Sequence, residues 1–205
     1  GGVVFRYLFG TSDFEAAEEE GFSGFPAFKL DKTRDGDRGY RSNVLYAFTS
    51  RMTSRKRGDF AEYLVAHWLP ENFTGSDFSL LAHTGARLPG DGFEIMADLS
   101  TVKEPFDMVM EVAGTRFQTD TDLQNVAIGD AVALVAEPDN PFDPNAIRIS
   151  HKSGSLGYVP KPHCAALKQK IASGLVSGRI QKLNGRPERR LVYLLMQVGN
   201  APLRS

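Results

Sequence analysis

The stretch EPDNPFDPNAIRI, at positions 137–149, holds the densest set of side chains in the sequence that could do chemistry. It offers three carboxylates, two amides and one phenyl ring. Its three prolines fix φ and remove backbone donors, so we expect a stiff connection. Asn and Asp in such loops usually bond the neighbouring backbone. The stretch therefore predicts a rigid loop that presents Phe142 and Asp143, unless the ring packs inward and the carboxylate only caps a turn.

Catalytic and metal-binding signatures are absent from the sequence. None of the patterns GxSxG, HExxH, GxxxxGK[ST] or CxxC occurs. His163 and Cys164 are adjacent, so on a helix they point to different faces and make a poor zinc site. The acids Glu137, Asp139 and Asp143 leave metal-dependent nuclease activity as a minor alternative. We expect a binding protein rather than an enzyme, with no metal and no cofactor.

The composition is that of a globular protein. Of the 205 residues, 41% are hydrophobic and 24% are charged. No apolar run is long enough to cross a membrane, and the start GGVVFRYLF lacks the basic and apolar regions of a secretory signal. The single cysteine, Cys164, excludes an internal disulfide and favours the reducing cytoplasm.

Charge is distributed unevenly along the chain. The net charge is −1, but residues 101–150 carry three bases and nine acids, whereas residues 151–205 carry ten bases and one acid. A segment of net charge +9 is a candidate surface for an anionic polymer. The alternative is a solvated basic surface balanced by its acidic neighbour.

The hydrophobic period changes near the middle of the chain. The first half predicts short helices that begin near residues 12, 59 and 76, with an irregular loop over 22–42. From about residue 105 the period is two, which predicts strands at 108–117, 131–137, 146–149, 156–159, 175–183 and 191–198. One helix is expected at 162–172. The pattern predicts an α+β protein with a mainly helical domain over residues 1–104 and a small bent barrel over 105–205.

The barrel interior should be filled by the inward residues of alternating strands. Candidates are Val132, Leu134, Ile147, Ile149, Leu194 and Met196.

Residues 108–198 resemble a HIRAN domain, a module found at the front of some chromatin-remodeller-like DNA translocases and alone in bacteria. The resemblance lies in the segments 112–117, 129–134, 137–147 and 154–161, of which 137–147 is the most specific. It implies a six-stranded barrel related to OB and SH3 folds, which binds single-stranded DNA and, in some members, a free 3′ end.

The resemblance also implies roles for individual residues. Phe117 and Phe142 would stack on terminal bases, which tolerates any sequence. Asp143 would accept the 3′ hydroxyl and repel a phosphate, so it would test whether an end is free. Gln118 stands where some members have a second aromatic residue, and both Phe rings lack the hydroxyl of the family's Tyr.

Polar groups would hold the rest of the strand. The resemblance implies that Arg116 and Lys161 bind phosphates, that Asn140 positions the loop or bonds the nucleotide, and that Tyr158 supplies a polar ring. Alternatives remain open. Asn145 is expected to bond the backbone in a turn, and Arg116 would otherwise pair with Glu137 or Asp139.

The first half resembles, over residues 44–96, the small N-terminal region of HipA-type toxin kinases. No phosphate loop or kinase-like metal-binding acids follow, so the resemblance implies a partner-binding or regulatory piece. The basic run from Arg51 to Arg57 would extend a nucleic-acid path or form a solvated loop, and the latter is favoured.

Two functions follow. The first is a nucleic-acid-binding module for single-stranded DNA or DNA 3′ ends. The second is a protein-interaction adaptor in a toxin–antitoxin or DNA-repair and defence complex, with the barrel as scaffold.

Overall fold

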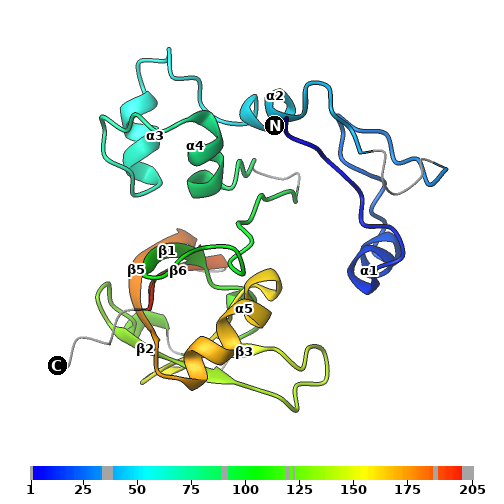
Figure 1. Cartoon of the computed structure of the whole chain (residues 1–205). Helices are drawn as coiled ribbons and strands as arrows, with labels where there is room; N and C mark the ends of the chain where they lie inside the picture. Colours follow the sequence, from blue (N-terminus) through cyan, green and yellow to red (C-terminus); the bar gives the residue numbers. More distant parts are fainter. Residues whose placement is uncertain are drawn as a thin grey trace. The chain divides into compact units, whose positions relative to one another are not determined.

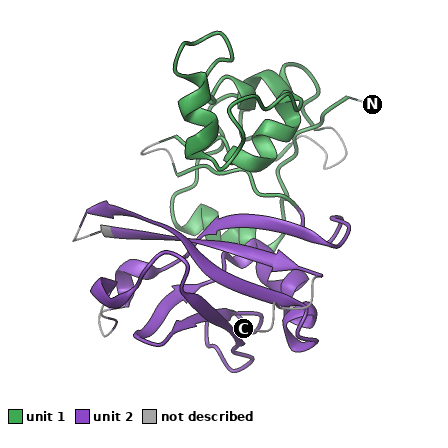
Figure 2. Ribbon diagram, turned by 90° about the vertical axis from the view of Figure 1, so that its left-hand side faces the viewer, with its two compact units in different colours: residues 1–97 green, residues 98–205 purple. Residues whose placement is uncertain are grey.

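The computed structural model describes residues 2–33, 39–88, 92–118, 121, 123–186 and 189–199. The chain divides into two compact units, Gly1–Ala97 and Asp98–Ser205, which are coloured separately in Figure 2. The division falls before residue 105 because Leu99 is buried and packs in the core of the second unit.

The first unit, unit 1, contains four short helices. They are α1 (Ser12–Glu19), α2 (Val44–Thr49), α3 (Phe60–Ala66) and α4 (Asp77–Thr84). Side chains cap two of them: Thr11 accepts from the backbone N–H of Phe14, and Ser76 from that of Ser79. Helices α1, α3 and α4 confirm the expected positions. The short α2 was not predicted, because its six residues are too few for a helical period to emerge and no capping-box pattern precedes them.

Aromatic side chains make up most of the core of unit 1. Phe25, Phe28 and Val44 are buried, and the rings of neighbouring residues pack around them, namely Phe5, Tyr7, Tyr40, Phe48 and Phe93. Beside this cluster lies a pocket of about 440 Å³, whose lining includes Phe14, Phe22, Phe25 and Phe93. Unit 1 therefore has an apolar cavity of its own.

The second unit, unit 2, is a strongly curled antiparallel sheet. Its strands are β1 (Phe106–Glu111), β2 (Ala131–Ala136), β3 (Ile147–His151), β4 (Gly154–Tyr158), β5 (Val176–Arg186) and β6 (Arg189–Val198). They pair in the order β1-β6-β5-β2-β3-β4 (Figure 1). The two ends of this order meet, because Ala113 and Tyr158 exchange backbone hydrogen bonds of 2.8 Å. The predicted six-stranded barrel is confirmed.

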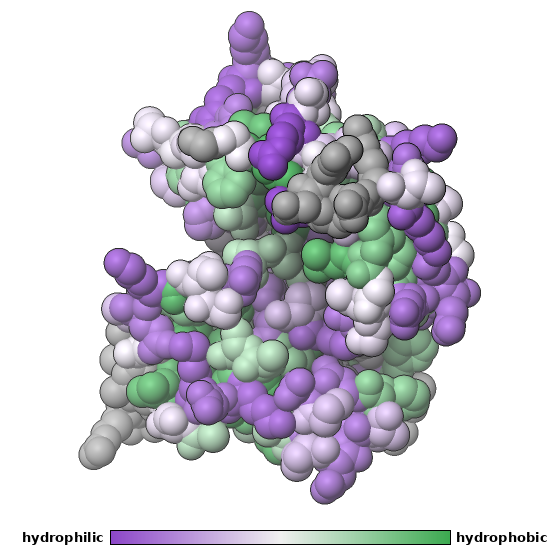
Figure 3. Space-filling view, turned by 45° about the vertical axis from the view of Figure 1, so that its right-hand side comes forward, coloured by the Kyte–Doolittle hydropathy of each residue, from purple (hydrophilic) through white to green (hydrophobic). Residues whose placement is uncertain are grey.

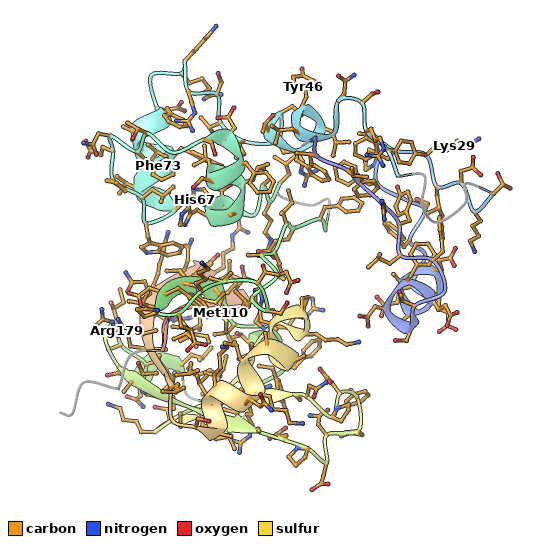
Figure 4. The ribbon with its side chains drawn as sticks, viewed as in Figure 1. Lys29, Tyr46, His67, Phe73, Met110 and Arg179 are labelled. Carbon is orange, nitrogen blue, oxygen red and sulfur yellow. The ribbon has the colours of Figure 1, made fainter. Side chains whose placement is uncertain are left out.

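The barrel core consists of inward residues from every strand. Ile147, Ile149, Leu194 and Met196 are fully buried, while Val132 and Leu134 are partly buried and pack against them, as predicted. Met110, labelled in Figure 4, belongs to the same core. The helix α5 (Lys161–Ala172) packs against β2 and β5 and buries Cys164 and Leu167.

One strand prediction is wrong at its end. Residues 108–117 were expected to continue as one strand, but β1 stops at Glu111 and residues Thr115–Phe117 form a 3₁₀ turn, η1. The cause is Gly114, whose φ of 75° lies in the left-handed region and turns the chain away from the sheet.

Hydrophilic side chains cover much of the face in Figure 3, with hydrophobic ones in separate patches. Among the large hydrophobic side chains that the structure describes, Phe142 is the most exposed, at 92%. No helix among the described residues is long and apolar enough to span a bilayer.

Candidate nucleic-acid interface

A row of outward residues crosses the barrel wall where its strands pair. Ile147 and Ile149 of β3 are buried inside, so Arg148 between them faces outward. In the sheet register Arg148 lies beside Tyr158 of β4, which in turn lies beside Ala113. Paired residues share a face of an antiparallel sheet. The register therefore places Arg148 and Tyr158 side by side on the outer surface, next to the segment that leads into η1.

The loop that joins β2 to β3, which we call the proline loop (residues 137–146), is fixed by its own polar side chains. The side-chain oxygen of Asn140 accepts from the backbone N–H groups of Phe142 and Asp143, at 3.0 and 3.3 Å. A carboxylate oxygen of Asp143 accepts from the N–H of Asn145 at 2.8 Å. The loop backbone thus has a defined course without help from the phenyl ring.

Phe142 is directed into solvent by this loop, since 92% of its surface is exposed. The alternative that the ring packs inward is therefore wrong. Asp143 does hold a turn, as its structural alternative required, but its carboxylate retains unused acceptor capacity. The expected backbone bond from the Asn145 side chain is wrong: its oxygen instead accepts from Lys168 Nζ at 3.3 Å.

Glu137 is the centre of a polar network beneath the loop. Its carboxylate accepts from Arg148 Nε at 2.5 Å, from Asn140 Nδ2 at 3.1 Å and from the Tyr158 hydroxyl at 3.1 Å. Partial burial would raise the pKa of Glu137, but the three donors outweigh it and the pKa lies below its ordinary value. Burial and the bond to this carboxylate raise the pKa of Tyr158. Glu137 is therefore an anion that links the proline loop to β3 and β4.

The turn η1 presents the second exposed ring. Thr115 is buried and donates its hydroxyl to the carbonyl of Val112, while Arg116 and Phe117 are exposed. The Arg116 guanidinium lies 4.6 Å from the centroid of the Phe117 ring, which has 68% of its surface exposed. A cation and an aromatic face thus stand together, and the turn packs against both β4 and β6.

The helix α5 lies against the proline loop and is bonded to it. Lys161 is its first residue and is exposed. Lys168 Nζ donates to the carbonyl of Pro144 at 2.9 Å, which ties the loop to the helix. Burial, with a smaller contribution from the Asp143 carboxylate, raises the pKa of the Cys164 thiol. The proline loop therefore lies against α5.

The predicted site residues fall into three neighbouring groups. Asn140, Phe142 and Asp143 share the proline loop, and Tyr158 joins them through Glu137. Arg116 and Phe117 follow Ala113, the backbone partner of Tyr158. Lys161 begins α5 three residues after Tyr158 in the sequence.

Sequence reasoning assigned the wrong partner to one residue of this surface and missed another. Glu137 was considered as a metal ligand or an ion-pair partner of Arg116, but its cationic partner is Arg148. Arg148 was overlooked although it is a polar residue between two core isoleucines, a position that must face outward.

No metal site emerges in the part of the chain that the structure describes, where no group of three or more His, Cys, Asp or Glu side chains is placed to hold an ion. His163 is buried, and burial lowers its pKa.

A comparison with protein families identifies part of the second unit. The family model of the HIRAN domain matches residues 105–190. Among solved structures, the HIRAN domain of human HLTF is 25% identical, with a TM-score of 0.37, and the match covers 45% of this chain and 74% of that chain. A protein from Lactobacillus plantarum is 23% identical, with a TM-score of 0.38, and the match covers 47% and 95%. No curated protein matches the chain.

Proposed function

Because residues 105–190 form a HIRAN domain, a DNA-binding module, we propose that the barrel binds single-stranded DNA and prefers a free 3′ end. The role is binding rather than catalysis. The bound strand runs along the surface formed by the proline loop, Tyr158 and η1, and Lys161 contacts its phosphates.

The observation that carries the proposal is the exposure of Phe142. A phenyl ring left 92% exposed forgoes the hydrophobic stabilisation that burial would give. The loop holds it there with prolines and with the side-chain oxygen of Asn140. Stacking on a nucleobase would bury the ring and is worth about 1–3 kcal/mol per base. A second exposed ring, Phe117, offers a place for another base.

Charged groups beside the rings match a phosphate backbone. Arg116 lies on the Phe117 ring, and Lys161 is exposed at the start of α5. Arg148 is engaged by Glu137 and Ser150 but still has about a third of its side chain exposed. Guanidinium and ammonium groups neutralise phosphates and release counterions, which adds affinity independent of sequence.

The preference for a free 3′ end rests on Asp143. Its carboxylate is partly exposed and, beyond the bond from Asn145, has acceptor capacity for a hydroxyl donor. A terminal phosphate in the same place would meet a like charge.

The test is a titration of the full chain with short oligonucleotides that differ only in their ends. We expect binding of single strands that falls steeply with salt and weakens when the 3′ end is phosphorylated. A 5′ phosphate should have little effect. Absence of single-strand binding at low salt would contradict the proposal.

A second candidate is a protein-binding role for unit 1. The apolar pocket of about 440 Å³ favours it, because aromatic pockets of this size accept apolar groups of a partner. Such an interaction would depend little on salt, which separates it from strand binding.

A further inference from the structure

The two longest strands of the barrel extend past their neighbours. In the sheet register, β1 reaches along β6 only to Tyr193, and β2 reaches along β5 only to Arg179. Beyond these points, residues 184–186 of β5 and 189–191 of β6 pair only with each other in the part of the sheet that the structure describes. We call this two-stranded part the basic ribbon. Figure 2 shows the two strands leaving the body of unit 2.

The charge of this hairpin is almost entirely positive. Residues 176–198 contain five bases, Arg179, Lys182, Arg186, Arg189 and Arg190, and one acid, Glu188. Arg179 and Arg186 are exposed and Arg190 is half-buried. None of these three forms an ion pair within the described residues, whereas Arg55, Arg57 and Arg148 all do.

The arginines lie on both faces of the hairpin. Arg190 shares a face with the inward residue Val192, because alternate residues of a strand point the same way. Arg186 is on the opposite face from Leu183, which pairs with Val192. Arg179, labelled in Figure 4, lies on the outer side of β5, next to the buried Ile180. A ligand that contacts both faces would enclose the ribbon.

The acids of the neighbouring strand do not reach the ribbon. Glu111, the last residue of β1, lies opposite Tyr193 and accepts its hydroxyl at 3.2 Å. Lys182 pairs with the same Tyr193, so one basic and one acidic residue flank this tyrosine at the base of the hairpin. Arg186 and Arg190 lie further out, past this pair. The outer part of the ribbon therefore has a positive potential of its own.

The ribbon adjoins the candidate interface. η1, which presents Arg116 and Phe117, packs against β6. The chain immediately before η1 is bonded to the same strand, since the N–H of Val112 donates to the carbonyl of Val192 at 2.8 Å. η1 therefore contacts both β6, whose first residues belong to the ribbon, and β4, which carries Tyr158.

We propose that the basic ribbon binds the sugar–phosphate backbone of a double-stranded segment next to the single strand. Single-strand sites combine cations with aromatic rings on which bases stack. The ribbon offers cations alone, since its described residues include no aromatic side chain. Bases in a duplex are already stacked, and its phosphates are dense, about one charge per 1.7 Å. A two-stranded ribbon also fits the major groove.

This inference rests on the proposed function only for the single-stranded part of the ligand. The preferred substrate is then a junction, in which a duplex continues into a single-stranded 3′ overhang. The proline loop and η1 hold the overhang, and the ribbon holds the duplex.

The experiment compares two probes with the full chain: a short single strand, and the same strand as the 3′ overhang of a duplex. The wild type is expected to bind the junction more tightly. Arg186→Gln with Arg190→Gln should remove this gain and leave the affinity for the single strand unchanged. The slope of log K against log salt for the junction should become shallower by about 0.9 for each phosphate that the variant no longer neutralises.

Two further double variants serve as controls. Lys29→Gln with Lys56→Gln makes the same change in net charge on exposed residues of unit 1 and should leave the gain intact. Arg186→Lys with Arg190→Lys keeps the charge and should retain most of the gain. Thermal melts of each variant report whether the barrel is intact.

The outcomes separate the two claims. Equal affinity of the wild type for both probes would overturn the ribbon site, and so would a gain that survives the double Gln variant or disappears equally in the Lys29 and Lys56 control. Junction binding that depends on Arg186 and Arg190, without any single-strand binding, would instead support the ribbon and refute the proposed function.

Discussion

At the residue scale, the position of the exposed ring depends on Glu137. This carboxylate receives three donors, and one of them, Asn140, holds the backbone of Phe142 through its other side-chain atom. The orientation of the Asn140 amide is therefore determined by Glu137 on one side and by the loop on the other.

Replacing Glu137 by Gln should loosen the loop. Gln has one acceptor oxygen where three donors converge, so the unfolding free energy should fall by about 1 kcal/mol, the low end for an unsatisfied polar group that is only partly buried. Single-strand affinity should fall as well. Glu111→Gln is the matched control, because Glu111 also accepts a tyrosine hydroxyl but belongs to β1.

Glu137→Gln should also be tested in the Phe142→Ala background. If Glu137 acts by holding the ring, its effect on binding should vanish once the ring is gone. Additive losses in titrations of the two single variants and the double variant would refute this positioning role.

The same network predicts a dependence on pH. The pKa of Glu137 lies below its ordinary value of 4.5, so the folded state favours the anion. Its stabilisation is therefore fully present above that pH and is lost as the pH falls through the lowered pKa. The stability difference between the wild type and Glu137→Gln should be constant from neutral pH down to about pH 5 and shrink below. Urea melts across this range measure it, and a constant difference at all pH values would contradict the account.

Asp143→Asn isolates the carboxylate charge, because Asn keeps an oxygen for the N–H of Asn145. The fold should be unchanged. Discrimination against a phosphorylated 3′ end should shrink, since the repulsion is gone. Titrations with free and phosphorylated ends measure the ratio, and an unchanged ratio would remove Asp143 from end recognition.

At the element scale, the sequence predicted the strands well because barrel strands alternate between core and solvent. The alternation of apolar and polar residues correctly located the strands β2 to β6 and the buried residues Ile147 and Ile149. It failed at 112–117, where Gly114 turns the chain and an apolar–polar pattern continues by coincidence into η1. Arg148 was missed because an ordinary outward strand position carries no motif that would single it out.

A histidine in helix α5 should make the stability of the protein depend on pH in a second, higher range. His163 is buried, its Nδ1 has no hydrogen-bond partner in the described structure, and burial lowers its pKa from 6.5. The unfolded chain therefore takes up a proton that the folded chain does not, and stability falls as the pH drops below about 6.5. His163→Leu should reduce this fall in melts at pH values on either side of 6.5. A fall of the same size in His163→Leu and in the wild type would contradict this role of His163.

At the scale of the whole molecule, unit 2 should fold alone. Its cluster of buried residues runs from Leu99 to Val198 and has members in five strands and α5, and Val132 and Leu134 of β2 pack against it. A fragment of residues 98–205 should therefore melt cooperatively and bind single strands like the full chain. Far-ultraviolet circular dichroism and the same titrations check this, and an unfolded fragment would refute the independence of the unit.

Unit 1 was less predictable from its sequence. Its helices are short and its core is a cluster of aromatic rings from loops and helices. The core residues therefore follow no hydrophobic period that the sequence would reveal. The basic run from Arg51 to Arg57 is largely explained by local partners: Arg55 pairs with Asp77, Arg57 pairs with Asp59, and Arg51 donates to the carbonyl of Ala86. This agrees with a structural loop rather than a nucleic-acid path.

The central claim is that an exposed ring on a rigid loop stacks on a nucleobase, and Phe142→Ala tests it most directly. Titration with a single-stranded oligonucleotide should show a loss of about 1–3 kcal/mol in binding free energy, while the thermal melt stays near that of the wild type because the ring is 92% exposed. Phe78→Ala removes another exposed ring, in unit 1, and should change neither. If Phe142→Ala binds as tightly as the wild type and as Phe78→Ala, the ring does not stack and the account is wrong.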